Sequence, residues 1–333
     1  HDGALYAGLW SYDWTRVNRD SLDFCRVYRY RGGREWWDCG QPGECKRLFS
    51  LASFQGRIYV LGDDYKCHVY VGGEEWRVCG VYQSHIHPMG VHDRKLYVGA
   101  FDAITVGGMR QAAVFSYDGK EWTNLGCPLG AAEPATQLHA LEVYRGKLYV
   151  TTWPTGKVAV LEDDGRWVDC GRLGASTEIN SLTVYNGKLY AGSIPRAEVY
   201  RYEGGTEWTR MARFFAPAGW EPVPAIGPGD RSDPKNTLAQ WTRVTSLTVH
   251  RGKLFAGIGS CTSALADAPA DVRGRVFAMQ AGQCVSYDQD IGPGWKHVAA
   301  VRKRNQLELY VNGKPAVVSP TFQPEDYDLS NEE

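Results

Sequence analysis

The chain has 333 residues, a formal net charge of -1 and 43% hydrophobic residues, with 38 Gly, 19 Tyr and 12 Trp. A near-zero net charge excludes a general attraction to nucleic acid or to an anionic membrane, so we expect neither as a partner. No apolar stretch approaches the roughly 18 residues that a membrane-spanning helix needs. The many glycine and aromatic residues are typical of short strands joined by tight turns.

One sequence unit recurs along the chain. It consists of an alternating apolar run, a tight turn and a Lys-Leu-Tyr-Val-like sequence. Because strict alternation on both sides of a tight turn is typical of paired strands, each copy predicts a β-hairpin. Five copies align directly, at residues 50–60, 89–98, 140–150, 181–191 and 246–256, and residues 2–7 and 298–311 fit the same template.

A second hairpin follows most copies of the first. Its strands flank a Gly-Gly or Asp-Gly turn and usually end in Glu-Trp, at residues 27–36, 69–76, 114–122, 160–167 and 199–208. Two hairpins per repeat give four antiparallel strands, which is one blade of a β-propeller. We therefore predict an all-β fold with a single domain over residues 1–333. It would hold seven four-stranded antiparallel blades that start near residues 1, 47, 85, 137, 178, 243 and 295.

The first predicted blade lacks its leading strand and the seventh is short. Strands from the N- and C-terminal segments would complete both blades if they close the ring together. Ring closure would also remove an exposed sheet edge.

Nine cysteines are present, which is an odd number. Cys39, Cys79 and Cys170 recur at one repeat position, which favours small buried side chains in matching places. The alternative, for a secreted protein, is disulfide bonding in pairs such as Cys39 with Cys45 or Cys25 with Cys67.

The innermost strands begin with polar residues on alternate positions. Because side chains alternate along a strand, residues nine and seven positions before each first-hairpin turn should point the same way. We expect them to line a polar funnel on the propeller axis, either as a functional site or as a hydrated channel without function. The nine-back set is Arg47, His85, Gln137, Glu178 and Arg243, and the seven-back set is Phe49, His87, His139, Asn180 and Thr245.

Loops between the second and third strands should open at the same mouth. They carry Tyr65, Trp153 and Arg196. A sugar ring stacks on aromatic faces and an acidic substituent pairs with Arg, although packing explains Tyr65 and Trp153 equally well.

His85 and His87 place two imidazoles on one face of a strand, and His139 could add a third ligand for zinc or calcium. The alternative is a set of hydrogen-bonded or proton-transferring histidines that requires no cofactor.

These features resemble a known family. The Gly-Lys-Leu-Tyr hairpins, the Glu-Trp hairpins, the axial histidines and residues 294–313 are similar to secreted seven-bladed propeller polysaccharide lyases of the ulvan lyase and rhamnose-glucuronate lyase type, and to related rhamnosidase propellers. Residues 294–313 also look like laminin-G-type sequence. The resemblance implies a secreted or periplasmic carbohydrate-active enzyme that acts on an anionic, uronic-acid-containing polysaccharide or oligosaccharide.

The resemblance implies β-elimination next to a uronate. This reaction needs donors at the carboxylate, a base for the C5 proton and an acid for the leaving oxygen. His87 or His139 would be the base, and His85 or Tyr65 the acid. The predicted substrate-binding residues are Arg47 and Arg243 at the carboxylate, with Gln137, Glu178, Asn180, Trp153 and Arg196.

Two other classes of protein stay open. A glycoside hydrolase usually needs two carboxylates about 5 to 10 Å apart. Glu178 is the one acidic residue of the two axial sets, with Asp63, Asp64 and Asp102 at the mouth. A non-catalytic sugar-binding propeller is the other class, since a fold does not dictate an activity.

Overall fold

The computed structural model describes residues 1–9, 25–82, 85–130, 133–214, 242–250, 252–260, 274–279, 285, 287, 291, 293–319 and 321. Over these residues the chain is all-β, as predicted, and none of them lies in a helix. The same residues accordingly hold no helix that is long and apolar enough to cross a membrane. The chain divides into two compact units, of which the first contains residues 1–181 and 203–208 and the second contains residues 182–202 and 209–214 and the described residues from 242 onward.

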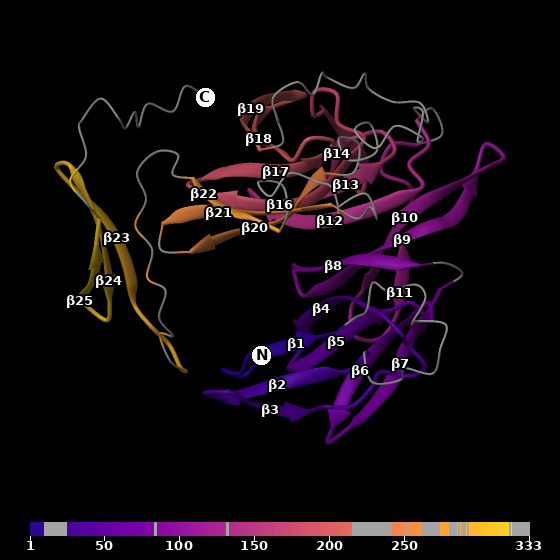
Figure 1. Cartoon of the computed structure of the whole chain (residues 1–333), viewed down its shortest axis with the longest axis horizontal. Coiled ribbons are helices and arrows are strands. Elements are labelled where there is room, and N and C mark those ends of the chain that lie inside the picture. Colours follow the sequence, from indigo (N-terminus) through magenta and orange to yellow (C-terminus); the bar gives the residue numbers. More distant parts are fainter. Residues whose placement is uncertain are drawn as a thin grey trace. The chain divides into compact units, whose positions relative to one another are not determined.

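The first unit contains four sheets, each a meander in which strands follow in chain order (Figure 1). The first sheet has three strands and the next three have four each. Their strands are β1 (Tyr6–Gly8), β2 (Val27–Gly32), β3 (Glu35–Asp38); β4 (Leu48–Phe54), β5 (Arg57–Gly62), β6 (Lys66–Gly72), β7 (Glu75–Val81); β8 (Ile86–His92), β9 (Lys95–Val106), β10 (Met109–Tyr117), β11 (Trp122–Asn124); β12 (Gln137–Tyr144), β13 (Lys147–Trp153), β14 (Lys157–Leu161) and β15 (Trp167–Arg172).

Three more sheets follow. The division between the units runs through the sheet of β16 (Glu178–Tyr185), β17 (Lys188–Ile194), β18 (Glu198–Gly204) and β19 (Glu207–Arg213). The second unit also holds β20 (Thr242–His250), β21 (Lys253–Ser260) and β22 (Val276–Met279), and then β23 (Val298–Lys303), β24 (Gln306–Val311) and β25 (Lys314–Val318). The described residues thus form seven antiparallel sheets, four of four strands and three of three. Seven blades and a closed ring stay predictions.

The predicted starts of the inner strands are close to the observed ones. Strands β4, β8, β12, β16 and β20 begin at Leu48, Ile86, Gln137, Glu178 and Thr242, within one residue of the predicted positions 47, 85, 137, 178 and 243. The turn signals located these strands because a two-residue hairpin fixes the register of both strands that it joins.

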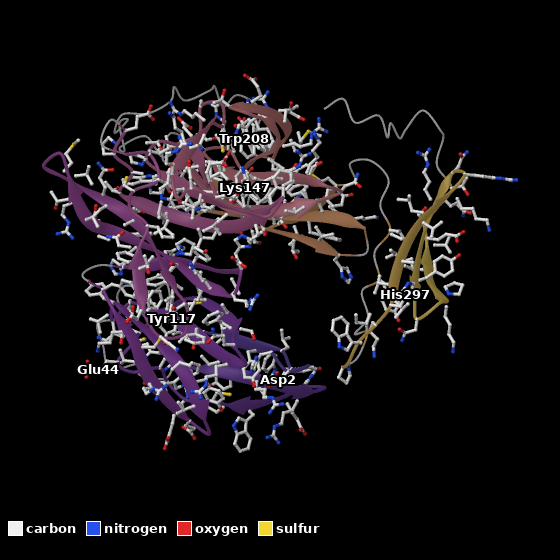
Figure 2. All side chains as sticks on the ribbon, turned by 180° about the vertical axis from the view of Figure 1, so that it is seen from behind. Asp2, Glu44, Tyr117, Lys147, Trp208 and His297 are labelled. Carbon is white, nitrogen blue, oxygen red and sulfur yellow. The ribbon has the colours of Figure 1, made fainter. Side chains whose placement is uncertain are left out.

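Buried apolar side chains fill the space between successive sheets of the first unit (Figure 2). One group lies between the sheets that contain β5 and β9, where Leu61, Val69 and Val98 are almost fully buried. Tyr117, labelled in Figure 2, packs against this group and stacks on Trp122 with a centroid distance of 4.7 Å. The alternating residues of the first hairpins therefore form the core, as their pattern predicted.

In four of the five second hairpins, the terminal tryptophan bonds to the preceding repeat. Its indole Nε1 donates to a backbone carbonyl at the end of the outer strand of the sheet before it. The four bonds are Trp76 to Cys39 (2.7 Å), Trp122 to Cys79, Trp167 to Leu125 and Trp208 to Cys170 (2.8 Å each). A buried indole N–H needs a partner, and here the partner is the next repeat.

The accepting carbonyls belong to the recurring Asp-Cys-Gly position. The Asp38 carboxylate accepts the N–H of Gly40 (2.8 Å), and Asp169 accepts that of Gly171 (2.7 Å). Both glycines have positive φ, and a Cβ on Gly40 would lie 2.4 Å from the carbonyl oxygen of Glu74 in the next sheet. Glycine at this position therefore allows the next outer hairpin to approach the turn.

The three recurring cysteines were predicted to be small buried side chains, and two of them are. Cys39 and Cys170 are buried, whereas Cys79 is half-buried. The alternative disulfides are wrong, because Cys25, Cys39, Cys45 and Cys67 are all free thiols in this structure.

Replacing Trp167 by Phe should lower the free energy of unfolding by about 1–2 kcal/mol, because the Leu125 carbonyl loses its indole donor while staying partly covered. Chemical unfolding followed by fluorescence measures this change. The matched control is Trp36→Phe, since Trp36 is 43% exposed and its indole donates no such hydrogen bond among the described residues. This replacement should change the free energy of unfolding by no more than about 0.5 kcal/mol. Equal losses in both variants would contradict the role of the indole bond.

Candidate functional site

The predicted axial residues of the first unit gather where four inner strands begin. Strand β8 packs against both β4 and β12, so the starts of these strands are neighbours. Figure 1 shows β4, β8 and β12 in this succession. Glu178, at the start of β16, joins the group through its contact with His139 on β12, and Asn180 is hydrogen-bonded to Glu178.

Aromatic rings and imidazoles alternate across the strand starts. The Tyr65 ring meets the edge of His85 at a centroid distance of 4.9 Å, and Phe49 lies 5.9 Å from His85 and 5.2 Å from His87. Phe101 lies 5.6 Å from His87. The two predicted bases are neighbours, since the centroids of His87 and His139 are 5.3 Å apart. The structure therefore brings together all four predicted catalytic residues, Tyr65, His85, His87 and His139.

His139 sits in a polar network with its strand neighbours. Its Nε2 donates to Gln137 Oε1 at 3.2 Å and lies 3.6 Å from Glu178 Oε1. Asn180 Nδ2 donates to the same carboxylate oxygen. These contacts confirm that residues two apart share a face at the starts of β12 and β16. Because carboxylate and amide oxygens surround Nε2, the proton is held there, and Nδ1 is the basic nitrogen of this imidazole.

Burial keeps the other two axial histidines neutral. Burial and the nearby His139 lower the pKa of His87 to about 3. Burial and the positive charge of Arg47 lower the pKa of His85. Both effects disfavour the charged imidazolium, so the two rings act as neutral hydrogen-bonding groups near pH 7.

Two ring nitrogens in this cluster are buried without a hydrogen-bond partner among the described residues. They are Nδ1 of His85 and Nδ1 of His87, and the buried Oδ1 of Asn180 shares this condition. Buried polar atoms are seldom left unpaired in folded proteins. Three such atoms in one cluster therefore favour a site that pairs them with a ligand or with water.

Arg47 forms an ion pair that its sequence position did not predict. Its Nε donates to Asp63 Oδ2 at 3.1 Å, and the backbone N–H of Arg47 donates to Asp63 Oδ1 at 3.0 Å. Both side chains are 12% exposed. The guanidinium also lies over the Phe49 ring, 5.5 Å from its centroid. We expected the positive charge of Arg47 to bind a substrate carboxylate, but Asp63 already balances part of this charge.

The remaining predicted binding residues fall into two groups. Trp153 pairs with Gln137 across β12 and β13, so it lies at the same end of the sheet as the histidines. Arg196 and Arg243 belong to the second unit. There Arg196 lies near the buried Glu198 and near Arg213, and burial and the charge of Arg213 lower its pKa.

The predicted histidine metal set is not compact in this structure. Among the described side chains, one set of three has all of its ligand atoms within 4.8 Å of one another, and it consists of Cys45, Asp64 and His68. Sequence reasoning missed this set because its members come from a loop, a turn and a strand. The spacing of Asp64 and His68 was the one available signal, and it is common by chance.

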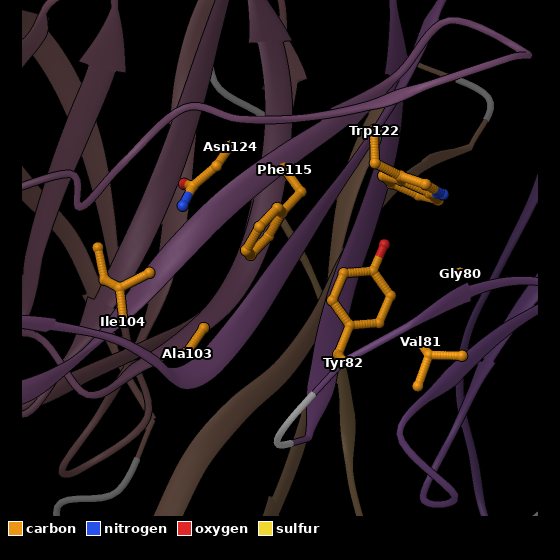
Figure 3. Close-up of a pocket in the computed structure, with 8 residues that line it drawn as sticks. All are labelled: Gly80, Val81, Tyr82, Ala103, Ile104, Phe115, Trp122 and Asn124. Carbon is orange, nitrogen blue, oxygen red and sulfur yellow. The ribbon is translucent and has the colours of Figure 1, made fainter.

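A separate pocket lies between the second and third sheets (Figure 3). Its volume is about 340 Å³, within the range of small-molecule sites. One wall of the pocket is formed by the aromatic rings of Tyr82, Phe115 and Trp122. The ring centroid of Tyr82 lies 5.5 Å from that of Phe115 and 5.6 Å from that of Trp122. The pocket offers few polar groups, so it provides packing surface without an evident acid or base.

Comparisons with known proteins identify the fold. No family model and no curated protein matches the sequence. A solved virginiamycin B lyase from Staphylococcus aureus is similar, with 10% identity, a TM-score of 0.53, and coverage of 96% of this chain and 99% of that chain. A streptogramin B lyase structure has 11% identity and a TM-score of 0.51, covering 87% of this chain and 85% of that chain. The extracellular domain of a putative hybrid two-component system from B. thetaiotaomicron has 12% identity and a TM-score of 0.51, covering 88% of this chain and 35% of that one. The shared fold is a β-propeller.

Replacing His87 by Gln should weaken the acid sensitivity of folding. The folded-state pKa of about 3 lies below the ordinary value of 6.5. As the pH falls through 6.5, the unfolded chain binds a proton that folded His87 does not bind, so stability is lost. Above pH 6.5 neither state binds it, and the contribution is constant. The loss amounts to about 1.4 kcal/mol per pH unit below 6.5.

Urea unfolding at several pH values between 7 and 4 measures this slope. The difference between the wild type and His87→Gln isolates the one group from all other titrations. Parallel stability curves for the two proteins would show that folded His87 takes up its proton as the unfolded chain does.

Proposed function

We propose that this propeller is a lyase that cleaves an anionic polysaccharide next to a uronate by β-elimination. The carrying observation is the His139 imidazole, whose Nε2 faces Gln137 and the Glu178 carboxylate while the neutral His87 lies beside it. A carboxylate on one ring nitrogen fixes the tautomer and stabilises the imidazolium that forms when the other nitrogen accepts a proton.

His139 is the better base of the two predicted candidates. A pKa of about 3 makes His87 a weak base near neutral pH, and base catalysis is most efficient when the pKa lies near the working pH. Glu178 Oε1 lies 3.6 Å from His139 Nε2, where its negative charge would stabilise the imidazolium form of His139. His87 instead offers a neutral, buried ring for hydrogen bonding to the substrate.

The proposed step balances with one base and one acid. Nδ1 of His139 takes the proton from C5 of the uronate, and the C–H electron pair forms the new C4–C5 double bond. The C4–O4 bond breaks, its electron pair stays on O4, and Tyr65 protonates that oxygen, since the neutral imidazole of His85 is a poor proton donor. Tyr65 has positive φ (62°), an uncommon backbone conformation for a bulky residue that is often found at functional sites.

The acidity of C5 rises when donors stabilise negative charge on the uronate carboxylate. Arg47 stays a candidate, although Asp63 already holds its Nε. Gln137, Asn180 and Trp153 would contact the sugar beside the base. The binding roles of Arg196 and Arg243 stay predictions from the sequence.

A hydrolase fits this arrangement less well. It would need one carboxylate as the acid and one as the nucleophile or base. In the described cluster Glu178 is held by Asn180 and faces His139, while Asp63 is held by Arg47. Both carboxylates are therefore already engaged by neighbouring side chains, which does not match a pair that faces a substrate.

The fold is compatible with elimination chemistry. Two solved propellers of TM-score above 0.5 are named as lyases, and a third structure is a virginiamycin B lyase described as catalytically inactive after one histidine was replaced by alanine. The reaction proposed for this chain rests on its own residues. The proposal further includes a secreted or periplasmic location and no required cofactor.

Replacing His139 by Ala should lower turnover by about 10²–10⁴-fold, the usual contribution of a positioned base. The measurement follows the ultraviolet absorbance of the unsaturated uronate product over a panel of uronate polysaccharides, with a reducing-end assay in parallel. Glu178→Gln should give a smaller loss and a shifted pH profile, because the imidazole keeps its place but loses the adjacent charge.

The matched control is His92→Ala, at the opposite end of β8. It should keep wild-type turnover. New reducing ends without new absorbance would establish hydrolysis. Retention of the polysaccharide without any product would establish a binding propeller.

A further inference from the structure

Three side chains of different chemistry converge outside the proposed catalytic cluster. Cys45 precedes β4, Asp64 lies in the turn between β5 and β6, and His68 is on β6. Asp64 Oδ2 is 2.9 Å from His68 Nε2, and Cys45 Sγ is 3.7 Å from the same nitrogen. Cys45 and His68 are at most 1% exposed, and the Asp64 side chain is 8% exposed.

The geometry differs from that of a Cys-His-Asp catalytic relay. In such a relay the carboxylate and the thiol occupy opposite nitrogens of the imidazole, so that a proton can pass between them. Here both groups face Nε2. Sulfur, nitrogen and oxygen atoms therefore surround a single point, which is the arrangement that a metal ion requires.

The separations match those of tetrahedral zinc. With Zn–S near 2.3 Å and Zn–N and Zn–O near 2.0–2.2 Å, tetrahedral angles place sulfur and nitrogen about 3.6 Å apart and nitrogen and oxygen about 3.4 Å apart. The observed 3.7 Å between Cys45 Sγ and His68 Nε2 fits directly. The 2.9 Å between His68 Nε2 and Asp64 Oδ2 needs an opening of about half an ångström.

The charges of the ligands suit a divalent cation, and with a Cys25 thiolate as the fourth ligand the zinc site would carry a net charge of about -1. A thiolate from Cys45 and the carboxylate of Asp64 supply two negative charges, and neutral His68 supplies none. Burying two anions without a compensating cation would be costly. Lys66 Nζ lies 3.8 Å from Asp64 Oδ2, but its side chain is 33% exposed and can turn to solvent.

Cys25 is the candidate for a fourth ligand. The thiol of Cys25 contacts that of Cys45, and both belong to one buried group. Cys25 lies outside the compact set of three, so its side chain would have to move toward His68 and Asp64 to bind the metal. Four protein ligands close a tetrahedral site, which is typical of structural zinc rather than catalytic zinc.

Two glycines keep the backbone close around the cluster. A Cβ on Gly62 would lie 2.1 Å from Cys45 Sγ, and a Cβ on Gly43 would lie 2.4 Å from His68 Cε1 and 3.0 Å from Asp64 Oδ2. Any larger residue at either position would displace a ligand atom. The glycines therefore allow the three ligands to converge.

We propose that Cys45, Asp64 and His68, with Cys25 as the fourth ligand, form a structural zinc site. The site would tie the segment before β4 to the turn between β5 and β6. These same two segments carry Arg47 and Asp63, whose ion pair lies beside the axial histidines. The zinc site is independent of the proposed lyase activity, because it requires only that these segments fold as described.

The test uses the full chain, stripped of metal by a chelator under reducing conditions and then titrated with Zn²⁺ or Co²⁺. We expect about one metal ion per chain by elemental analysis. Bound Co²⁺ should show the visible absorption of a tetrahedral site and the ultraviolet charge-transfer band of thiolate ligation. His68→Ala and Asp64→Asn should weaken binding by at least about 100-fold. Gly62→Ala should weaken it as well, although Gly62 supplies no ligand.

Cys127→Ser and His92→Ala are the matched controls and should bind like the wild type. The Co²⁺ spectrum of the wild type identifies the thiolate ligand even if a Cys45 variant does not fold. A folded, reduced chain that binds neither metal would overturn the proposal. So would peptide mapping that finds a Cys25–Cys45 disulfide in a chain that binds no metal after reduction.

Discussion

The hydrogen bond from one indole to the carbonyl of the preceding repeat sets the spacing of the sheets in the first unit. Trp76, Trp122, Trp167 and Trp208 each reach back in this way, over 2.7–2.8 Å. A directional bond at the same place in four successive repeats does what apolar packing alone cannot, because packing is non-directional. Each of these hydrogen bonds therefore ties the second hairpin of one sheet to the outer strand of the sheet before it.

The starts of the inner strands are aligned as a result. When outer strands are fixed in register, the starts of β4, β8 and β12 come side by side, and polar residues at equivalent positions meet. His87 and His139 come from different sheets, yet their ring centroids are 5.3 Å apart. The polar cluster is thus a consequence of repetition: one polar position per repeat becomes a group of interacting side chains.

The same logic explains what could be predicted from the sequence. Alternation and turn residues located the inner strands to within one residue, and they placed Gln137 with His139 and Glu178 with Asn180 on shared faces. Contacts across loops were not predictable in this way. The pairing of Arg47 with Asp63 and the convergence of Cys45, Asp64 and His68 depend on the path of a loop, which no periodicity encodes. The first sheet, as described, has the three strands β1, β2 and β3, in line with the prediction that the first blade lacks its leading strand.

The Arg47–Asp63 ion pair and the set of Cys45, Asp64 and His68 belong to the same sheet. The consecutive residues Asp63 and Asp64 connect them. Asp63 faces Arg47, whose charge helps to keep His85 neutral, while Asp64 faces His68 and Cys45. Any change that moves the turn between β5 and β6 must therefore act on both clusters at once. A rigid anchor at Asp64 would keep Asp63 in place and hold Arg47 against Phe49. Tyr65 is the next residue in the chain and is 40% exposed. Its side chain therefore remains free to move when a ligand binds.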